Sequence, residues 1–348
     1  MRWQVFGASV LAAFVLGGCQ EAAKPVAPAP ARPLIIASFF TLADFARQIA
    51  GDRAEVVSLV PAGVESHDWE PSPRDVTRVE KATVFIYNGS GFDPGAERLA
   101  KTSVPASTVV VEATAGLPLV RADLPGHDKA HDKEAHGDKH ADKKHGHDKK
   151  HDDDKKHGEK TGGGTANTAK AESEQDPHVW LDPTLAVAQV EAIRAGLAKA
   201  NPANADHYAS NAKSYAARLT ALHEAFTTGL AQCKRREIVV SHAAFTYLAD
   251  RYKLLQIPVM GLAPQAEPSP AELARVVRLV RRLKANVIFF ETLVSPRLAE
   301  TLAAEVGAKT LVLNPVEGLT AEEEKAGKDY VALMQDNLAN LRAALDCR

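Results

Sequence analysis

Short apolar runs alternate with helical patterns along most of the chain. Runs rich in β-branched and aromatic residues are separated by segments in which apolar residues recur at helical spacing. Because strands that alternate with helices usually form parallel sheets covered by helices, this pattern predicts an α/β fold. The predicted strands are Leu34–Ala37, Ala54–Val60, Thr83–Tyr87, Thr108–Val111, Glu237–Val240, Asn286–Phe290 and Lys309–Leu313.

A helix-start sequence occurs twice. Glu70–Pro73 and Glu267–Pro270 both read Glu-Pro-Ser-Pro, and an acid follows each serine by three residues. This is the chemistry of a capping box with proline at the first helical position. Each predicted helix leads into a hydrophobic strand, Thr83–Tyr87 or Asn286–Phe290. The echo predicts two pseudo-symmetric lobes with mostly parallel sheets, and chance recurrence of a common capping sequence is the alternative.

The stretch between the two copies favours one long helix. Residues 203–231 contain no proline, and no glycine before Gly229. A helix of up to about 29 residues would be about 40 Å long, which predicts a stiff connector rather than a hinge loop. We expect a first lobe at 34–202, a connecting helix at 203–232 and a second lobe at 233–348. The apolar residues at helical spacing are Tyr208, Tyr215, Leu219, Leu222 and Phe226.

The first residues have the pattern of a cleaved export signal. Residues 5–16 are almost wholly apolar, and Leu16-Gly17-Gly18-Cys19 follows. This stretch is shorter than the roughly 20 residues needed to cross a bilayer, so we interpret residues 1–18 as a signal peptide. The cysteine resembles the lipobox of bacterial lipoproteins, which implies a membrane-anchoring lipid on Cys19; an ordinary signal peptide is the alternative. We expect a flexible tether at 19–33 and a location in the periplasm or at the cell surface.

Charge and cysteine content narrow the class of partner. The net charge of −2 over 348 residues produces no global electrostatic field that would attract nucleic acid, so we expect no nucleic-acid partner. We also expect the protein to be a monomer. An exported protein lies where disulfides persist, so Cys233 and Cys347 could pair with each other. Two buried or free thiols are the alternative, because sequence alone does not show geometry.

A charged, histidine-rich tract interrupts the first lobe. Its lysines and acids balance, and it lacks the apolar residues needed for a core, so we expect a disordered loop at 126–175. Imidazoles on such a loop form a weak auxiliary site for Zn²⁺, Cu²⁺ or Ni²⁺, and a solvated spacer is the alternative. The histidines are His127, His131, His136, His140, His145, His147, His151 and His157.

Three other histidines stand where ligands usually bind. His67 lies in a loop beyond one predicted strand, His242 directly follows another, and His178 lies in an irregular segment after the tract. In open α/β sheets, ligands bind beyond the carboxyl ends of the strands. Each histidine alone could be structural. Three converging imidazoles would make a Zn²⁺ site with one position left for an oxygen.

The contexts of these histidines carry a family resemblance. The segments are Glu65-Ser66-His67-Asp68-Trp69-Glu70-Pro71-Ser72-Pro73, Asp176-Pro177-His178-Val179-Trp180-Leu181-Asp182-Pro183, Ser241-His242-Ala243-Ala244-Phe245-Thr246-Tyr247-Leu248 and Glu267-Pro268-Ser269-Pro270. From about Pro33 onward the chain resembles the ZnuA/TroA-like (cluster A-I) metal-binding proteins of ABC importers. The resemblance implies two lobes bridged by one rigid helix, with the metal in the interlobe cleft. It also implies ligands at His67, His178 and His242.

The third histidine helps to choose the metal. Manganese-binding members of this family have a carboxylate where this chain has His242. Imidazole nitrogens favour Zn²⁺, whereas Mn²⁺ prefers oxygen, so we expect Zn²⁺ as the bound ion. The histidine-rich insertion before the second ligand is likewise typical of the zinc-binding members.

The fourth ligand stays open at this point. Many relatives have an aspartate ligand in a late Asp-Pro segment, where this chain has Asn314. Water, Asn314 and Glu65 are the candidates. Glu291 ends a predicted strand and could accept a hydrogen bond that orients a ligand imidazole, although a salt bridge or helix cap would explain it equally well.

The predicted function is capture and delivery. The resemblance implies a solute-binding protein, not an enzyme, that passes Zn²⁺ to the permease of an ABC importer. One rival is a zinc hydrolase that uses the open coordination position to activate water. A second is a surface adhesin or zinc-storage lipoprotein without a transport role.

Overall fold

The computed structural model describes Trp3 and residues 32–121, 175–262 and 268–348. The chain divides into two units, Met1–Arg32 and Pro33–Arg348, and every element below belongs to the second unit. The predicted signal peptide apart from Trp3, the lipid attachment at Cys19 and the eight tract histidines lie outside the described residues. Within those residues, none of the helices is long and apolar enough to span a membrane.

Two four-stranded parallel sheets have the same strand order. The orders are β2-β1-β3-β4 and β6-β5-β7-β8, which confirms two α/β lobes of equal topology. β6 was not among the predicted strands because its run is short and ends in Pro258, and proline is tolerated only at sheet edges such as this one. The strands are β1 Leu34–Ala37, β2 Glu55–Ser58, β3 Val84–Tyr87, β4 Val109–Glu112, β5 Glu237–Val240, β6 Leu255–Pro258, β7 Val287–Phe290 and β8 Lys309–Val312.

The two capping sequences begin equivalent helices. Ser72 caps α2 and Ser269 caps α7, each in a complete capping box with the acid three residues later. Both helices connect the second and third strands of their own lobe, so the echo marks a repeated βαβ connection. The helices are α1 Phe40–Ala50, α2 Pro73–Val79, α3 Pro94–Thr102, α4 Pro183–Ala200, α5 Ala205–Gly229, α6 Thr246–Tyr252, α7 Pro270–Leu283, α8 Arg297–Val306, α9 Ala321–Lys325 and α10 Tyr330–Ala344.

Alternate residues of the strands face different cores. Ile35 of β1 points into a central core, whereas Ile36 points into a core formed with α2 and α3. In the second sheet Val240 of β5 faces the same central core, whereas Val239 faces a core formed with α7 and α8. The central core therefore continues from one lobe into the other, so the lobes are joined by close-packed side chains as well as by the chain itself.

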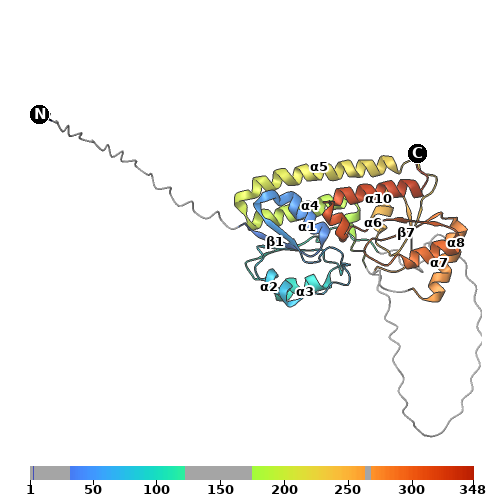
Figure 1. The fold of residues 1–348 in the computed structure, drawn as a ribbon, viewed down its shortest axis with the longest axis horizontal. Helices are drawn as coiled ribbons and strands as arrows, with labels where there is room; N and C mark the ends of the chain where they lie inside the picture. Colours follow the sequence, from blue (N-terminus) through green and yellow to red (C-terminus); the bar gives the residue numbers. More distant parts are fainter. Residues whose placement is uncertain (1–2, 4–31, 122–174, 263–267) are drawn as a thin grey trace, which may run out of the picture. The chain divides into compact units, whose positions relative to one another are not determined.

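α5 is the long helix that joins the lobes, and α10 lies beside it (Figure 1). It has 25 residues and starts after the short 3-10 helix Pro202–Asn204, and the five apolar residues predicted for one face are buried. Arg218 pairs with Asp329 at the start of α10, at 2.7 Å. After the carboxyl ends of α5 and α10, a disulfide joins Cys233 and Cys347. The two helices thus pack side by side and are joined by an ion pair and a disulfide.

Candidate metal centre

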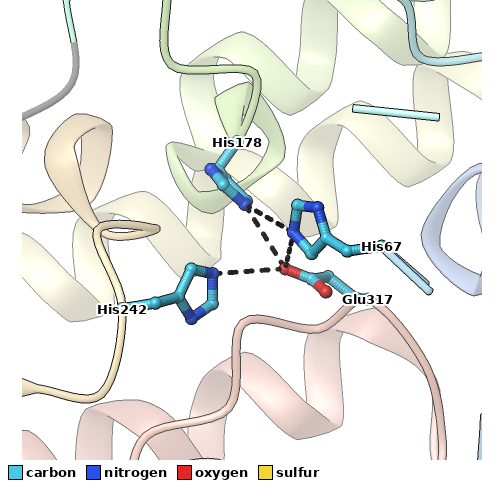
Figure 2. Close-up of side chains that lie close together, drawn as sticks. All are labelled: His67, His178, His242 and Glu317. Carbon is cyan, nitrogen blue, oxygen red and sulfur yellow. Dashed lines mark hydrogen bonds and ion pairs between the residues drawn. The ribbon is translucent and has the colours of Figure 1, made fainter. Parts of the chain in front are cut away.

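Three histidines and one glutamate converge on a single point (Figure 2). His67, His178, His242 and Glu317 each offer one donor atom, and these atoms all lie within 4.8 Å of one another. Glu317 Oε1 lies 3.6 Å from Nε2 of His67, 3.4 Å from Nε2 of His178 and 3.8 Å from Nε2 of His242. The Nε2 atoms of His67 and His178 are 3.4 Å apart.

These separations suit a tetrahedral ion. With metal–ligand bonds of about 2.05 Å, the edge of a tetrahedron of donors is about 3.3 Å. The four separations given above, 3.4 to 3.8 Å, are close to this value. The donors are also well shielded from water, because the side chains of His178 and His242 are 0% exposed, that of Glu317 is 3% exposed and that of His67 is 11% exposed.

Each lobe contributes two of the four side chains. His67 lies in the loop after β2, and His178 precedes the 3-10 helix Val179–Leu181 at the start of the α4 segment. His242 lies two residues beyond the end of β5, and Glu317 lies in the loop after β8. The parallel strands place these loops at the carboxyl ends of both sheets, where the sequence pattern predicted a ligand.

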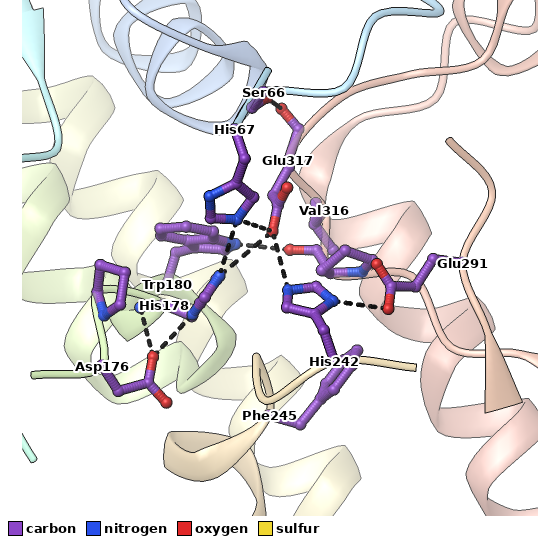
Figure 3. A network of polar contacts seen from close by, with 12 residues as sticks. Ser66, His67, Asp176, His178, Trp180, His242, Phe245, Glu291, Val316 and Glu317 are labelled. Atoms are coloured by element: carbon purple, nitrogen blue, oxygen red, sulfur yellow. Dashed lines mark hydrogen bonds and ion pairs between the residues drawn. The ribbon is translucent and has the colours of Figure 1, made fainter. Parts of the chain in front are cut away.

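Two carboxylates orient the ligand imidazoles from behind (Figure 3). Nδ1 of His178 lies 2.8 Å from Oδ1 of Asp176, and Nδ1 of His242 lies 2.7 Å from Oε1 of Glu291. If Nδ1 carries the proton that it donates to the carboxylate, the lone pair of Nε2 points at the centre. Glu291 thus lies where the sequence suggested a partner for an imidazole.

Aromatic rings pack against the imidazoles of His67 and His178. Phe92 lies edge-on to His67, with ring centroids 4.8 Å apart, and also contacts His178 and Trp180. Phe39 completes this cluster against Phe92 and Trp180. These rings shield the site from water, so charges at the centre interact in a region of low local dielectric constant.

The turn before Glu317 has an unusual backbone that aims its side chain. Val316 has φ of +60°, a left-handed conformation that costs a β-branched residue about 1–3 kcal/mol. Three contacts hold it: Asn314 Oδ1 accepts from the Val316 amide at 2.7 Å, Thr41 Oγ1 donates to the Val316 carbonyl, and Trp180 Nε1 donates to the Pro315 carbonyl at 2.7 Å. Two of these three contacts come from the other lobe.

Two of the candidate oxygen ligands have other partners. The Asn314 carboxamide oxygen binds the Val316 amide, and its Nδ2 donates to Thr292 Oγ1 at 3.2 Å, so the side chain shapes the turn. Glu65 lies outside the group of four donors, and its Oε2 accepts from the Asp68 amide at 3.2 Å. Burial, together with the negative charge of nearby Glu317, raises the pKa of Glu65 to about 7.

The charged and polar groups at the centre favour the binding of a cation. Among the described residues, Glu317 Oε1 and His242 Nε2 are buried and meet no hydrogen-bond partner in good geometry. Burial opposes the charged form of Glu317, yet the three histidines hold its pKa well below the usual range. Burial likewise opposes the charged form of His178, but Asp176 and Glu317 raise its pKa to about 9. A bound divalent cation would satisfy both orphaned atoms.

Sequence reasoning missed Glu317 and Asp176. Glu317 stands three residues after the asparagine that was considered, in a loop whose direction depends on the positive φ of Val316. Asp176 is two residues before His178, and the Asp-Pro-His spacing was a usable signal for it. An acid two residues from a candidate ligand is a natural partner for its second ring nitrogen.

Comparison with known proteins gives a consistent set of matches. Residues 35–344 match the family described as zinc-uptake complex component A, periplasmic. The high-affinity zinc uptake system protein ZnuA of Bacillus subtilis is 34% identical over 311 residues, which are 89% of this chain and 87% of that protein. The zinc-binding lipoprotein AdcA of Streptococcus pneumoniae is 36% identical over 312 residues, which are 90% of this chain and 56% of that protein. The crystal structure of the Zn(II)-bound ZnuA-like domain of Streptococcus pneumoniae AdcA matches with a TM-score of 0.69 at 33% identity, covering 90% of this chain and 99% of that one.

Proposed function

Since the chain belongs to the family of periplasmic zinc-uptake components, we propose that it captures Zn²⁺ with three histidines and Glu317 and delivers it to the permease of an ABC-type importer. The histidines are His67, His178 and His242. In this proposal Asp176 and Glu291 orient two of the imidazoles, and Asn314 shapes the turn that carries Glu317.

The closed set of four donors is the observation that carries this proposal. Three imidazole nitrogens and one carboxylate oxygen at tetrahedral spacing match the ligand preference of Zn²⁺, whereas Mn²⁺ prefers more oxygens and a higher coordination number. Titration of the purified protein against a chromophoric chelator tests it, with one tight Zn²⁺ per chain as the expected result. Equal affinity for Mn²⁺ would overturn the choice of metal.

The same donor set argues against the rival zinc hydrolase. Catalytic zinc sites keep one coordination position for water or substrate, and here a fourth protein donor stands at that position. The family is one of transport components, and solute binding is the role that this closed site supports. Peptidase and esterase assays on zinc-loaded protein should show no activity above that of the metal-free protein.

An adhesive or zinc-storage role without transport is the other rival. The neighbouring genes distinguish this role from import, because an importer requires a permease and an ATPase.

We propose that the protein is exported and is held to a membrane by a lipid on Cys19, as the Leu16–Cys19 pattern suggests. The lobe boundaries at 34–202 and 233–348 stay predictions.

Zinc affinity should rise with pH, because protons compete with Zn²⁺ for the ligand nitrogens. The pKa of His178 is raised to about 9 in the metal-free protein, so this imidazole is protonated at pH 7 and must lose its proton when Zn²⁺ binds. Calorimetric titration at pH 7 in buffers of different ionisation enthalpy should detect release of about one proton or more per Zn²⁺. Affinity should fall from pH 8 to pH 5; an affinity independent of pH over this range would contradict the imidazole ligand set.

Deletion of residues 126–160 should leave the tight site intact. The chain enters and leaves the histidine-rich segment through paired residues, because Arg121 bridges Gln175 and the Asp176 amide donates to the Val120 carbonyl at 2.9 Å. We propose that the tract histidines gather metal weakly at high local concentration near the tight site. Equilibrium dialysis should therefore show fewer weakly bound ions after deletion and an unchanged tight site. Loss of the tight site would refute this separation of roles.

A further inference from the structure

α6 belongs to the second lobe but contacts the segment of the first lobe that carries His178. The hydroxyl of Tyr247 donates to the carbonyl oxygen of Asp176 at 2.8 Å and accepts from the amide of Val120 at 3.1 Å. Tyr247 is buried, at 4% exposure. Since Asp176 holds both the amide and the Nδ1 atom of His178, this hydroxyl fixes one end of the His178 segment.

Arg251 fixes the other end of that segment. Its Nε donates to Asp182 Oδ2 at 2.7 Å, and its Nη2 donates to Thr184 Oγ1 at 2.9 Å. Asp182 is itself the N-cap of α4, because its Oδ1 accepts from the Thr184 amide at 2.8 Å. The Asp182 side chain is 3% exposed, so this charge-assisted bond is better shielded from water than an ordinary surface ion pair.

Both contacts come from one face of α6, and α6 is tied closely to His242. Tyr247 and Arg251 are four residues apart, which places them one above the other on the helix. The helix begins four residues after His242, and the intervening residues are buried. The Phe245 amide donates to Gln256 Oε1 at 2.7 Å, which anchors this short connection to β6. A movement of α6 would therefore move His242 with it.

We propose that Tyr247 and Arg251 form an interlobe clamp that holds His178 and His242 at metal-binding distance and slows the release of Zn²⁺. The inference rests on the proposed zinc site. The other two donors have their own connection, because Ser66 Oγ donates to the Glu317 carbonyl at 3.2 Å and the Gly63 amide donates to the Leu319 carbonyl at 2.7 Å. Separation of His178 from His242 therefore requires that the contacts of Tyr247 and Arg251 break. This holds whether or not the contacts near His67 and Glu317 break.

The test measures zinc association and dissociation separately in four full-length proteins: wild type, Tyr247→Phe, Arg251→Ala and the control Arg281→Ala. The control removes the 2.6 Å ion pair between Arg281 and Glu305, which lies within the second lobe. Dissociation is followed by stopped flow after addition of excess chelator. Arg251→Ala should release Zn²⁺ about tenfold faster and Tyr247→Phe about threefold faster, with association changed less than twofold. The control should release Zn²⁺ at the wild-type rate.

A merely structural role predicts a different pattern. In that case the variants would melt at lower temperature in the metal-free state but would release Zn²⁺ at the wild-type rate; this outcome overturns the clamp. Asp182→Asn keeps the oxygen that caps α4 and removes the charge that Arg251 binds, so it should speed release as much as Arg251→Ala, and the double variant should add little. Failure of the wild type to bind one tight Zn²⁺ would instead overturn the proposed function.

Discussion

His178→Ala is expected to abolish tight zinc binding. The imidazole is 0% exposed, its Nε2 lies 3.4 Å from both His67 Nε2 and Glu317 Oε1, and no solvent has ready access to replace it. Removing one of four protein donors should weaken binding by about a hundredfold or more, since loss of an outer partner alone typically costs ten- to a hundredfold. The chelator competition titration that defines the wild-type site measures this loss directly.

The same variant should lose most of the zinc-dependent stabilisation. At a free Zn²⁺ concentration a thousandfold above Kd, a ligand that binds only the folded state adds about 4 kcal/mol to the free energy of unfolding. The wild type should therefore melt at a clearly higher temperature with Zn²⁺, and at the same Zn²⁺ concentration a hundredfold loss of affinity leaves His178→Ala with at most about 1.4 kcal/mol of this stabilisation. His207→Ala is the control, because His207 lies on α5 and contacts Asn211 rather than the donor group. Full zinc binding by His178→Ala, or its loss in His207→Ala, would contradict the assignment.

Glu317→Gln is expected to weaken zinc binding by about a hundredfold. This is the upper end of the ten- to hundredfold loss of affinity that is typical when a group that orients a metal ligand is removed. The carboxylate is the one anionic donor among the four, and a neutral amide oxygen is a weaker ligand that leaves the charge of the ion less compensated. The substitution keeps the size of the side chain and the Val316 turn, so the loss reports on the oxygen donor. Competition titration against the wild type gives the ratio.

Glu65→Gln is the matched control for this substitution. Glu65 also lies near the centre, and its carboxyl is influenced by Glu317, but it is outside the group of four donors. Its replacement should change zinc affinity less than about threefold, as expected for a residue that does not bind the ion. If Glu65→Gln costs as much as Glu317→Gln, the fourth ligand has been assigned to the wrong carboxylate.

Local patterns were sufficient for most of the architecture, although not for β6, and for part of the site. Alternating strands and helices predicted the two α/β lobes, and the two capping boxes predicted their equivalence, because capping depends on residues within one helical turn. The long apolar stripe of α5 predicted the connecting helix. The positions of His67, His178 and His242 after strands and in recognisable segments made them the candidate ligands before any distance was known.

Only the tertiary structure decided the fourth donor and the groups around the histidines. Asn314, Glu65 and Glu317 are all polar residues in loops, and the positive φ of Val316 selects which oxygen reaches the centre. That backbone is held by Thr41, which is 275 residues away in the sequence. The pairing of α6 with the His178 segment is equally non-local. Sequence by itself determined seven of the eight described strands, the connecting helix and the three candidate imidazoles, because short-range capping and periodicity act between near neighbours. Which side chains meet at one point was decided by the packing of the two lobes, which brings together residues that no local pattern connects.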